Sequence, residues 1–318
     1  MPEPPPDDPE PPRTSPGHQP GPSPDEPGLG GGRVPWRAWL ANLGLRVLTA
    51  VVAIPLVLLM LYRAPLPVFG AFTVLVAGWA AIELGRMTLR GHPLQQALLV
   101  VATIGLDATW VFARAPDVTL AAGYGVVVLG AFGALLRPRP LETVAGRMAW
   151  SIGGPFYLAA GLSAVANLHQ LTDGGTWVVL SLCLAWGSDT GAFVAGRFLG
   201  RTPLSPAVSP AKTVEGALGG LATIVLMALV VRQLGLPELA VGHAVVLALL
   251  GGLAGQAGDL CMSAIKRSTG VKDTGRLLPG HGGLLDRIDA VLFTAMTTWL
   301  YARWVLDIAL RLDLPWST

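Results

Sequence analysis

Two polar segments of the sequence contain residues that could together bind phosphate groups. The longer segment extends from Asp259 to Asp289 and follows an apolar stretch. If that stretch continues as a helix, Asp259, Ser263 and Lys266 fall at positions i, i+4 and i+7 and share one face. A carboxylate, a hydroxyl and an ammonium on one helix face can hold a metal ion and a phosphate.

Two further aspartates stand where the next apolar stretch begins. Asp286 and Asp289 follow a Pro-Gly-His-Gly-Gly turn, and the helix dipole favours carboxylates at this position. Because Mg²⁺ requires hard oxygen ligands and shares its other positions with substrate phosphates, we predict that Asp259 and Asp286 bind Mg²⁺. Helix capping or an ion pair explains Asp289 equally well. His281, in the turn, is expected to contact a leaving phosphate group or to complete the turn.

The second polar segment lies upstream, between two other apolar stretches. Asp189, near the end of one stretch, is a candidate for binding metal or nucleotide. Ser209, Lys212 and Thr213 precede the next stretch, where a helix N-terminus would favour anions, so they are candidates for phosphate contacts. Helix capping explains Ser209 and Thr213 as well as substrate contact does, and Glu215 is expected to cap the same helix.

The composition indicates a membrane protein. Of the 318 residues, 52% are hydrophobic and 13% are charged, against about 25% charged residues in an average soluble domain. The net charge of +2 is too small to suggest nucleic acid as a partner. Residues 1–33 are rich in proline and contain no apolar run, so we expect an uncleaved, disordered cytoplasmic tail, followed by a membrane-embedded catalytic domain at 34–318.

Apolar stretches near the length of about 20 residues that crosses a bilayer recur from residue 45 onward. We predict an all-α, polytopic fold with about nine transmembrane helices. The predicted spans are 45–62, 66–84, 95–113, 118–136, 149–167, 176–194, 215–234, 239–258 and 288–308. Pro65, Pro67, Pro116 and Pro155 are expected at span ends, and Pro55 inside the first span.

The distribution of basic residues predicts the orientation. Most Lys and Arg residues lie in the N-terminal region and the even-numbered loops, which places these parts in the cytoplasm. We expect the protein in the plasma membrane. Both polar segments then meet a cytoplasm-facing polar cavity, because ionisable groups near a membrane are costly unless they are paired or hydrated. Small residues spaced four apart, at Gly216 and Gly220 and at Gly251 and Gly255, indicate close helix packing.

The polar segments resemble those of the phosphatidate cytidylyltransferase family. The signature of that family reads Ser-x-apolar-Lys-Arg, four residues, Lys-Asp, a turn with His-Gly-Gly, and a closing Asp-Arg-apolar-Asp. Here it covers residues 259–289, with matches at Ser263, Lys266, Arg267, Lys272, Asp273, His281, Gly282, Gly283, Asp286, Arg287 and Asp289. The upstream matches include Asp189, Ser209, Lys212, Thr213 and Glu215, whereas Phe193, Ala211 and Val214 depart from the common family residues.

The resemblance implies that CTP and phosphatidic acid are the substrates and that CDP-diacylglycerol and pyrophosphate are the products. The lipid phosphate would attack the α-phosphorus of CTP with the help of Mg²⁺, and a second cation and a homodimer are left open. From the residues themselves we predict that Asp259, Asp286, Lys266 and Asp289 are catalytic, with Asp189 as a further metal candidate. The implied substrate-binding residues are Ser263, Arg267, Lys272, Asp273, His281, Arg287, Lys212, Ser209 and Thr213.

Two other functions fit parts of this pattern. A CTP-dependent kinase of a polyprenol or another lipid alcohol would also be membrane-bound and would also require a metal. A transporter would place polar residues near helix ends, but it often has paired halves with interrupted helices, and the segment 259–289 has no repeat in the first half of the sequence. Cytidylyl transfer is therefore the favoured interpretation.

Overall fold

The computed structural model describes residues 55–113, 115–275 and 282–308. Its long helices are α2 (Leu66–Thr88), α3 (Pro93–Phe112), α4 (Pro116–Leu135), α5 (Val144–His169), α6 (Gly174–Leu199), α7 (Val214–Gly235), α8 (Val241–Ser268) and α9 (Leu285–Trp304). Residues 55–63 are also helical, and a short 3-10 helix, η1 (Leu141–Thr143), precedes α5. A hairpin of β1 (Pro203–Ser205) and β2 (Ser209–Thr213) connects α6 to α7.

Helices α2 to α8 are each long and apolar enough to cross a membrane. A helix satisfies its backbone hydrogen bonds internally, as the hydrocarbon core of a bilayer requires. Large apolar side chains such as Leu75, Leu120 and Phe132 are exposed on the outer faces of these helices. The chain is therefore an α-helical, polytopic membrane protein, as predicted. Because α9 does not join this group and most of span 45–62 lies outside the described residues, the count of nine remains a prediction.

The helix boundaries lie within a few residues of the predicted spans, with one informative exception. Helix α8 continues ten residues beyond its predicted end and reaches Ser268. Asp259, Ser263 and Lys266 are consequently helical, which was the condition for placing them on one face. The hairpin between α6 and α7 was not predicted, because its two strands are too short to give a periodic pattern.

The prolines mark helix starts with one correction. Pro65 is the N-cap of α2, and α4 begins at Pro116, where the missing N–H of proline costs nothing. Pro155, which we expected at a span end, lies inside α5 instead. Neighbouring helices make such a proline tolerable, because the backbone groups that it frees find other partners in a helix bundle.

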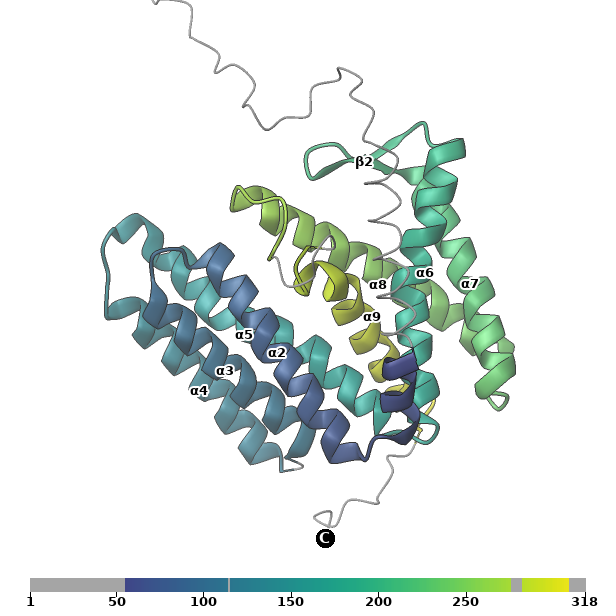
Figure 1. The fold of residues 1–318 in the computed structure, drawn as a ribbon, viewed down its shortest axis with the longest axis horizontal. Helices are drawn as coiled ribbons and strands as arrows, with labels where there is room; N and C mark the ends of the chain where they lie inside the picture. Colours follow the sequence, from purple (N-terminus) through teal and green to yellow (C-terminus); the bar gives the residue numbers. More distant parts are fainter. Residues whose placement is uncertain (1–54, 114, 276–281, 309–318) are drawn as a thin grey trace, which may run out of the picture. The chain divides into compact units, whose positions relative to one another are not determined.

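Helices α8 and α9 lie between a group formed by α2 to α5 and a pair formed by α6 and α7 (Figure 1). Helix α9 packs against α5, α6 and α8. The closest approach of α6 and α7 depends on small residues, since a Cβ atom at Gly220 would lie 2.7 Å from the Ser188 carbonyl oxygen. On α8, a Cβ atom at Gly251 would lie 2.7 Å from Leu184, and one at Gly255 would lie 2.8 Å from Thr294. These contacts confirm that the spaced glycines are packing positions.

Candidate active site

The hairpin is fastened to the start of α7 by Glu215. Its carboxylate accepts hydrogen bonds from the Arg201 N–H at 3.0 Å, the Thr202 N–H at 3.1 Å and the Thr202 hydroxyl at 2.9 Å. These donors precede β1, so Glu215 holds the base of the hairpin. Its carboxylate also accepts its own backbone N–H in the first turn of α7, in line with the expectation that it caps this helix. Thr213 is the N-cap of α7, and its hydroxyl accepts the Gly216 N–H at 3.1 Å, which confirms the capping interpretation.

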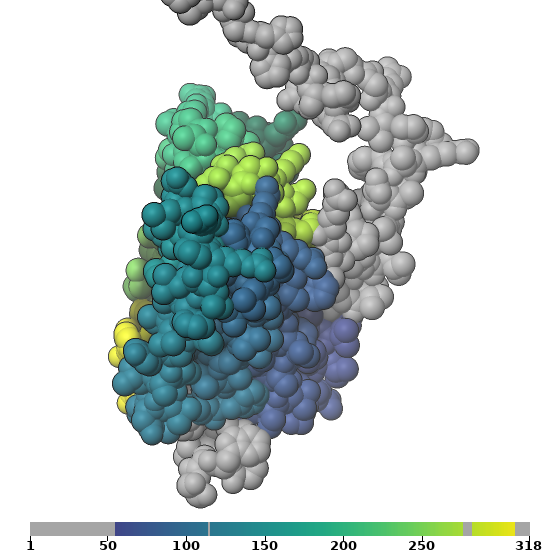
Figure 2. Space-filling model, turned by 90° about the vertical axis from the view of Figure 1, so that its left-hand side faces the viewer, coloured from purple at the N-terminus to yellow at the C-terminus, as the bar shows by residue number. Residues whose placement is uncertain are grey.

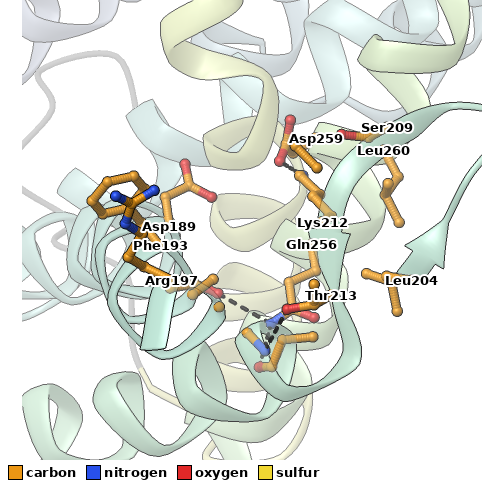
Figure 3. A pocket seen from close by; sticks show the side chains of 16 residues that line it. Asp189, Phe193, Arg197, Leu204, Ser209, Lys212, Thr213, Gln256, Asp259 and Leu260 are labelled. Atoms are coloured by element: carbon orange, nitrogen blue, oxygen red, sulfur yellow. Dashed lines mark hydrogen bonds and ion pairs between the residues drawn. The ribbon is translucent and has the colours of Figure 1, made fainter. Parts of the chain in front are cut away.

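The hairpin projects Lys212 onto helix α8. The ammonium of Lys212 forms an ion pair with Asp259 Oδ2, and both side chains are half-buried (Figure 3). In Figure 2, the green segment that contains the hairpin adjoins the yellow-green end of α8. The two polar segments of the sequence, 47 residues apart at this ion pair, therefore meet in space.

Lys212 also interacts electrostatically with more distant carboxylates. Its partial burial lowers the pKa of the ammonium below the ordinary value, and the negative charges of Asp189 and Asp289 act in the opposite direction. Asp289 in turn interacts electrostatically with Lys266, Asp189 and Asp286. The site is thus one network of interacting charges that extends over α6, the hairpin, α8 and α9.

A cavity of about 650 Å³ opens between α6, the hairpin and α8. This volume is within the range of about 300–1,000 Å³ that is typical of small-molecule sites. The polar wall includes Asp189, Arg197, Ser209, Lys212, Thr213, Gln256 and Asp259. Apolar side chains line it as well: Phe193 lies on one side, beside Asp189 and Arg197, and Leu204 and Leu260 lie on the other (Figure 3). The cavity can therefore receive a molecule that carries both anionic and apolar groups.

A second ion pair lies at the junction of α8 and α9. Lys266 Nζ is 2.7 Å from Asp286 Oδ1. The other oxygen of Asp286 accepts hydrogen bonds from the Thr274 N–H at 2.9 Å, the Thr274 hydroxyl at 3.0 Å and the Gly283 N–H at 3.1 Å. Asp286 consequently ties both ends of the connecting loop to α8, in addition to any role in the reaction.

Glu83 of α2 is a buried residue of the site that was not among the predicted site residues. This carboxylate is only 3% exposed and accepts hydrogen bonds from the Leu284 N–H, the Leu285 N–H and the Thr274 hydroxyl. Gln256 was also missed; its amide donates to the Ser188 hydroxyl and the Ala217 carbonyl beside the cavity. A carboxylate inside an apolar span is itself a signal of function, and it could have drawn attention to Glu83.

The other predicted residues that the structure describes do not line the cavity. Ser263 is half-buried on α8, and Asp289 is buried, with one oxygen accepting the Ala290 N–H at 2.8 Å. The exposed members of the set are Arg267, Lys272, Asp273 and Arg287. His281 lies outside the described residues, so the structure does not address its role.

The carboxylates suit Mg²⁺ as oxygen donors, although they do not form a metal site by themselves. In the part of the chain that the structure describes, no three His, Cys, Asp or Glu side chains gather as a metal-binding group. Asp259 and Asp286 each pair with a lysine instead. Mg²⁺ is usually held by one or two carboxylates together with substrate phosphates, so Asp259 and its neighbours fit a cation that arrives with a nucleotide.

The fold and the site define a class of protein: a polytopic membrane protein with a cavity for an anionic and partly apolar ligand at its helix ends. A model of the cytidylyltransferase family matches residues 44–305. A phosphatidate cytidylyltransferase of Bacillus subtilis (strain 168) is 32% identical over 267 residues, which are 80% of this chain and 95% of the relative. The chain therefore belongs to the cytidylyltransferase family, whose members are nucleotidyltransferases.

Other relatives match over a shorter region. A phosphatidate cytidylyltransferase of Brucella suis biovar 1 (strain 1330) is 41% identical over 162 residues, which are 48% of this chain and 56% of the relative. The uncharacterized protein YnbB of Escherichia coli (strain K12) is 45% identical over 135 residues, which are 42% of this chain and 45% of YnbB. In both alignments the chain spans about half of the length of the relative.

Proposed function

We propose that this enzyme transfers a cytidylyl group from CTP to phosphatidic acid and produces CDP-diacylglycerol and pyrophosphate. The observation that carries the proposal is the cavity that Lys212, Asp259 and Ser209 line together with the apolar side chains of Phe193 and Leu260. A nucleotide and the phosphate of a lipid require a polar wall, and the acyl region of the lipid requires an apolar one. The names of the Bacillus and Brucella relatives support the same substrates.

The reaction needs no protein nucleophile. The phosphate of phosphatidic acid is largely dianionic at pH 7, since the second pKa of a phosphate monoester is near ~6. One of its oxygens attacks the α-phosphorus of CTP, a new P–O bond forms, and the bond from the α-phosphorus to the bridging oxygen breaks. Pyrophosphate leaves with the electron pair of that bond. The protein must therefore align two anions and offset the charge that develops.

The basic residues supply that charge. We assign Lys212 and Lys266 to the phosphates of the two substrates, because each ammonium already lies beside a carboxylate of the site. Ser209, Thr213, Ser263, Arg267 and Lys272 are assigned to further phosphate contacts. Asp273, His281 and Arg287 complete the proposed substrate-binding set.

The carboxylates serve as the proposed metal ligands. Asp259 and Asp286 would hold Mg²⁺, with Asp189 as a further ligand and Asp289 as a residue that orients the basic side chains. When bound, the cation would offset negative charge on the phosphates; a second cation would do the same for the attacking or the leaving oxygen. The ion pairs hold Lys212 beside Asp259 and Lys266 beside Asp286, so each lysine would lie next to a phosphate that the metal ion binds.

The proposed orientation places this site on the cytoplasmic side of the plasma membrane, where CTP is found. The hairpin and the α8–α9 junction belong to even-numbered loops, which the basic residues assign to the cytoplasm together with the N-terminus. The lipid substrate would reach the cavity from the bilayer. Membership of a transferase family favours this reaction over transport, and the names of the relatives favour it over phosphorylation of a lipid alcohol.

Acceptor specificity tests the proposal. Purified protein with CTP and Mg²⁺ would be given phosphatidic acid, diacylglycerol or a polyprenol, and the lipid products would be weighed by mass spectrometry. We expect CDP-diacylglycerol from phosphatidic acid and no product from either alcohol. A phosphorylated alcohol, with no nucleotide-linked lipid, would contradict the proposal and identify a CTP-dependent lipid kinase.

A further inference from the structure

Helix α9 begins at a carboxylate that a distant helix provides. The Leu284 N–H donates to Glu83 Oε1 at 3.0 Å, and the Leu285 N–H donates to Glu83 Oε2 at 2.9 Å. The first N–H groups of a helix have no partner within the helix, and the dipole favours a negative charge there. Glu83 thus caps α9 from α2, across about 200 residues of sequence.

The same carboxylate reaches the loop that carries the family signature. The Thr274 hydroxyl lies 3.0 Å from Glu83 Oε2 and 3.0 Å from Asp286 Oδ2. Because a hydroxyl has one proton, Thr274 donates to one of these carboxylates at a time, and the Thr274 N–H holds Asp286 throughout at 2.9 Å. Asp286 is in turn paired with Lys266. A chain of polar contacts therefore runs from α2 to the proposed catalytic lysine.

Two glycines of the segment 259–289, Gly275 and Gly283, leave the space that Glu83 occupies. A Cβ atom at Gly275 would lie 2.5 Å from Glu83 Oε1, and one at Gly283 would lie 2.6 Å from Glu83 Oε2. A side chain at either position would require the Glu83 carboxylate to move. The loop before α9 is thus shaped around the carboxylate, which is 3% exposed and receives a further hydrogen bond from the Trp79 indole at 3.2 Å.

We infer that Glu83 is a positioning residue for the reaction, which rests on the function proposed above. Glu83 fixes the first turn of α9 and, through Thr274, the side chain of Asp286. It therefore sets where Asp286 and Lys266 stand relative to the substrates without touching them. Residues that orient metal ligands in this way typically change activity by roughly 10- to 100-fold when they are replaced.

Glu83→Gln is the sharpest variant, because glutamine keeps the volume and replaces one acceptor oxygen by an NH₂ group that faces an N–H donor. We expect kcat to fall roughly 10- to 100-fold with little change in the KM for CTP. We also expect peptides that cover residues 282–290 to exchange their amide hydrogens roughly 10-fold faster, as the loss of one hydrogen bond to a charged group predicts. Glu142→Gln, at an exposed position of η1, is the matched control.

Both effects are required. If Glu83→Gln is folded and either kcat or the exchange of residues 282–290 is unchanged, the positioning role is overturned. If that variant does not fold, Thr274→Val carries the test, with a smaller fall in kcat and the same faster exchange expected. A wild-type protein that forms no CDP-lipid would instead contradict the proposed function, and the exchange result would still decide whether Glu83 holds the start of α9.

Discussion

Lys212 joins the hairpin to helix α8, and its two roles can be separated. Both side chains of its ion pair with Asp259 are partly exposed, and ion pairs that water can reach contribute about 1 kcal/mol or less to stability. A phosphate contact in the reaction is worth much more, because removing one preorganised donor lowers rates by roughly 10²- to 10³-fold. The residue should therefore matter for activity and hardly at all for folding.

We predict that Lys212→Met lowers kcat/KM for CTP by roughly 100-fold or more and changes the Tm little. Initial rates and thermal unfolding of the purified variant measure the two quantities. Arg90→Gln removes an exposed charge that is distant in sequence from Lys212, and it should leave kcat/KM and Tm unchanged. Near-normal kcat/KM in Lys212→Met would show that this lysine does not contact a reacting substrate.

At the scale of elements, the pairing of α6 with α7 supports the cavity, since both helices line it. The two helices approach so closely at Gly220 that a methyl group there would meet the Ser188 carbonyl oxygen at 2.7 Å. Backbone cannot move aside as a flexible side chain can. Overpacking at such a contact typically costs about 1–3 kcal/mol.

Gly220→Ala should accordingly lower the Tm and reduce the amount of folded protein recovered from membranes. Gly125→Ala is the matched control, because a Cβ atom at Gly125 of α4 would have no neighbour within 4 Å. Alanine is the better helix former, so this control should leave stability unchanged or raise it slightly. Equal Tm values for the two variants would refute the assignment of Gly220 to a close helix contact.

The helices of this fold could be predicted from the sequence, and some contacts at the site could not. Apolar runs of about 20 residues identify membrane helices directly. The continuation of α8 to Ser268 lies beyond its predicted end, and it was only the condition for placing Asp259, Ser263 and Lys266 on one face. The role of Glu83 depends on a contact with residues about 200 positions away. No local pattern contains that information, just as none contains the ion pair between Lys212 and Asp259.

The roles of residues in the polar segments were also predicted only in part. The capping role of Thr213 was one of two predicted readings, because it depends only on the next three residues. Glu215 was assigned to its own helix, and it does accept its own N–H in the first turn of α7. Its hydrogen bonds with Arg201 and Thr202 were not predicted, since the hairpin that brings them near has no periodic signature. Contacts between residues close in sequence were thus predictable, and the hydrogen-bond donors that the hairpin brings to Glu215 were not.

At the scale of the whole molecule, the orientation in the membrane determines which substrates can reach the site. The basic residues predict that the hairpin faces the cytoplasm and that the α5–α6 connection faces the opposite side. Both connections offer exposed positions for a reporter thiol, at Ala207 and Thr172. The native cysteines, Cys183 and Cys261, are free thiols and would first be replaced by serine.

In that background, Ala207→Cys should react with a membrane-impermeant maleimide only after cells are permeabilised, and Thr172→Cys should react in intact cells. Gel shifts of the labelled protein measure the reaction. Labelling of Ala207→Cys from outside intact cells would show that the predicted topology is inverted. Cytoplasmic CTP could then not reach the cavity.

If the enzyme transfers the cytidylyl group at the cavity beside Lys212 and Asp259, the α-phosphorus of CTP must end in the lipid product. Purified protein in lipid micelles would be given phosphatidic acid, Mg²⁺ and CTP labelled with ³²P at either the α- or the γ-position, beside Asp259→Asn. We predict that α-label enters the chloroform-soluble lipid, that γ-label appears only in pyrophosphate, and that Asp259→Asn transfers neither. Entry of γ-label into lipid, or full transfer of α-label by Asp259→Asn, would contradict this account.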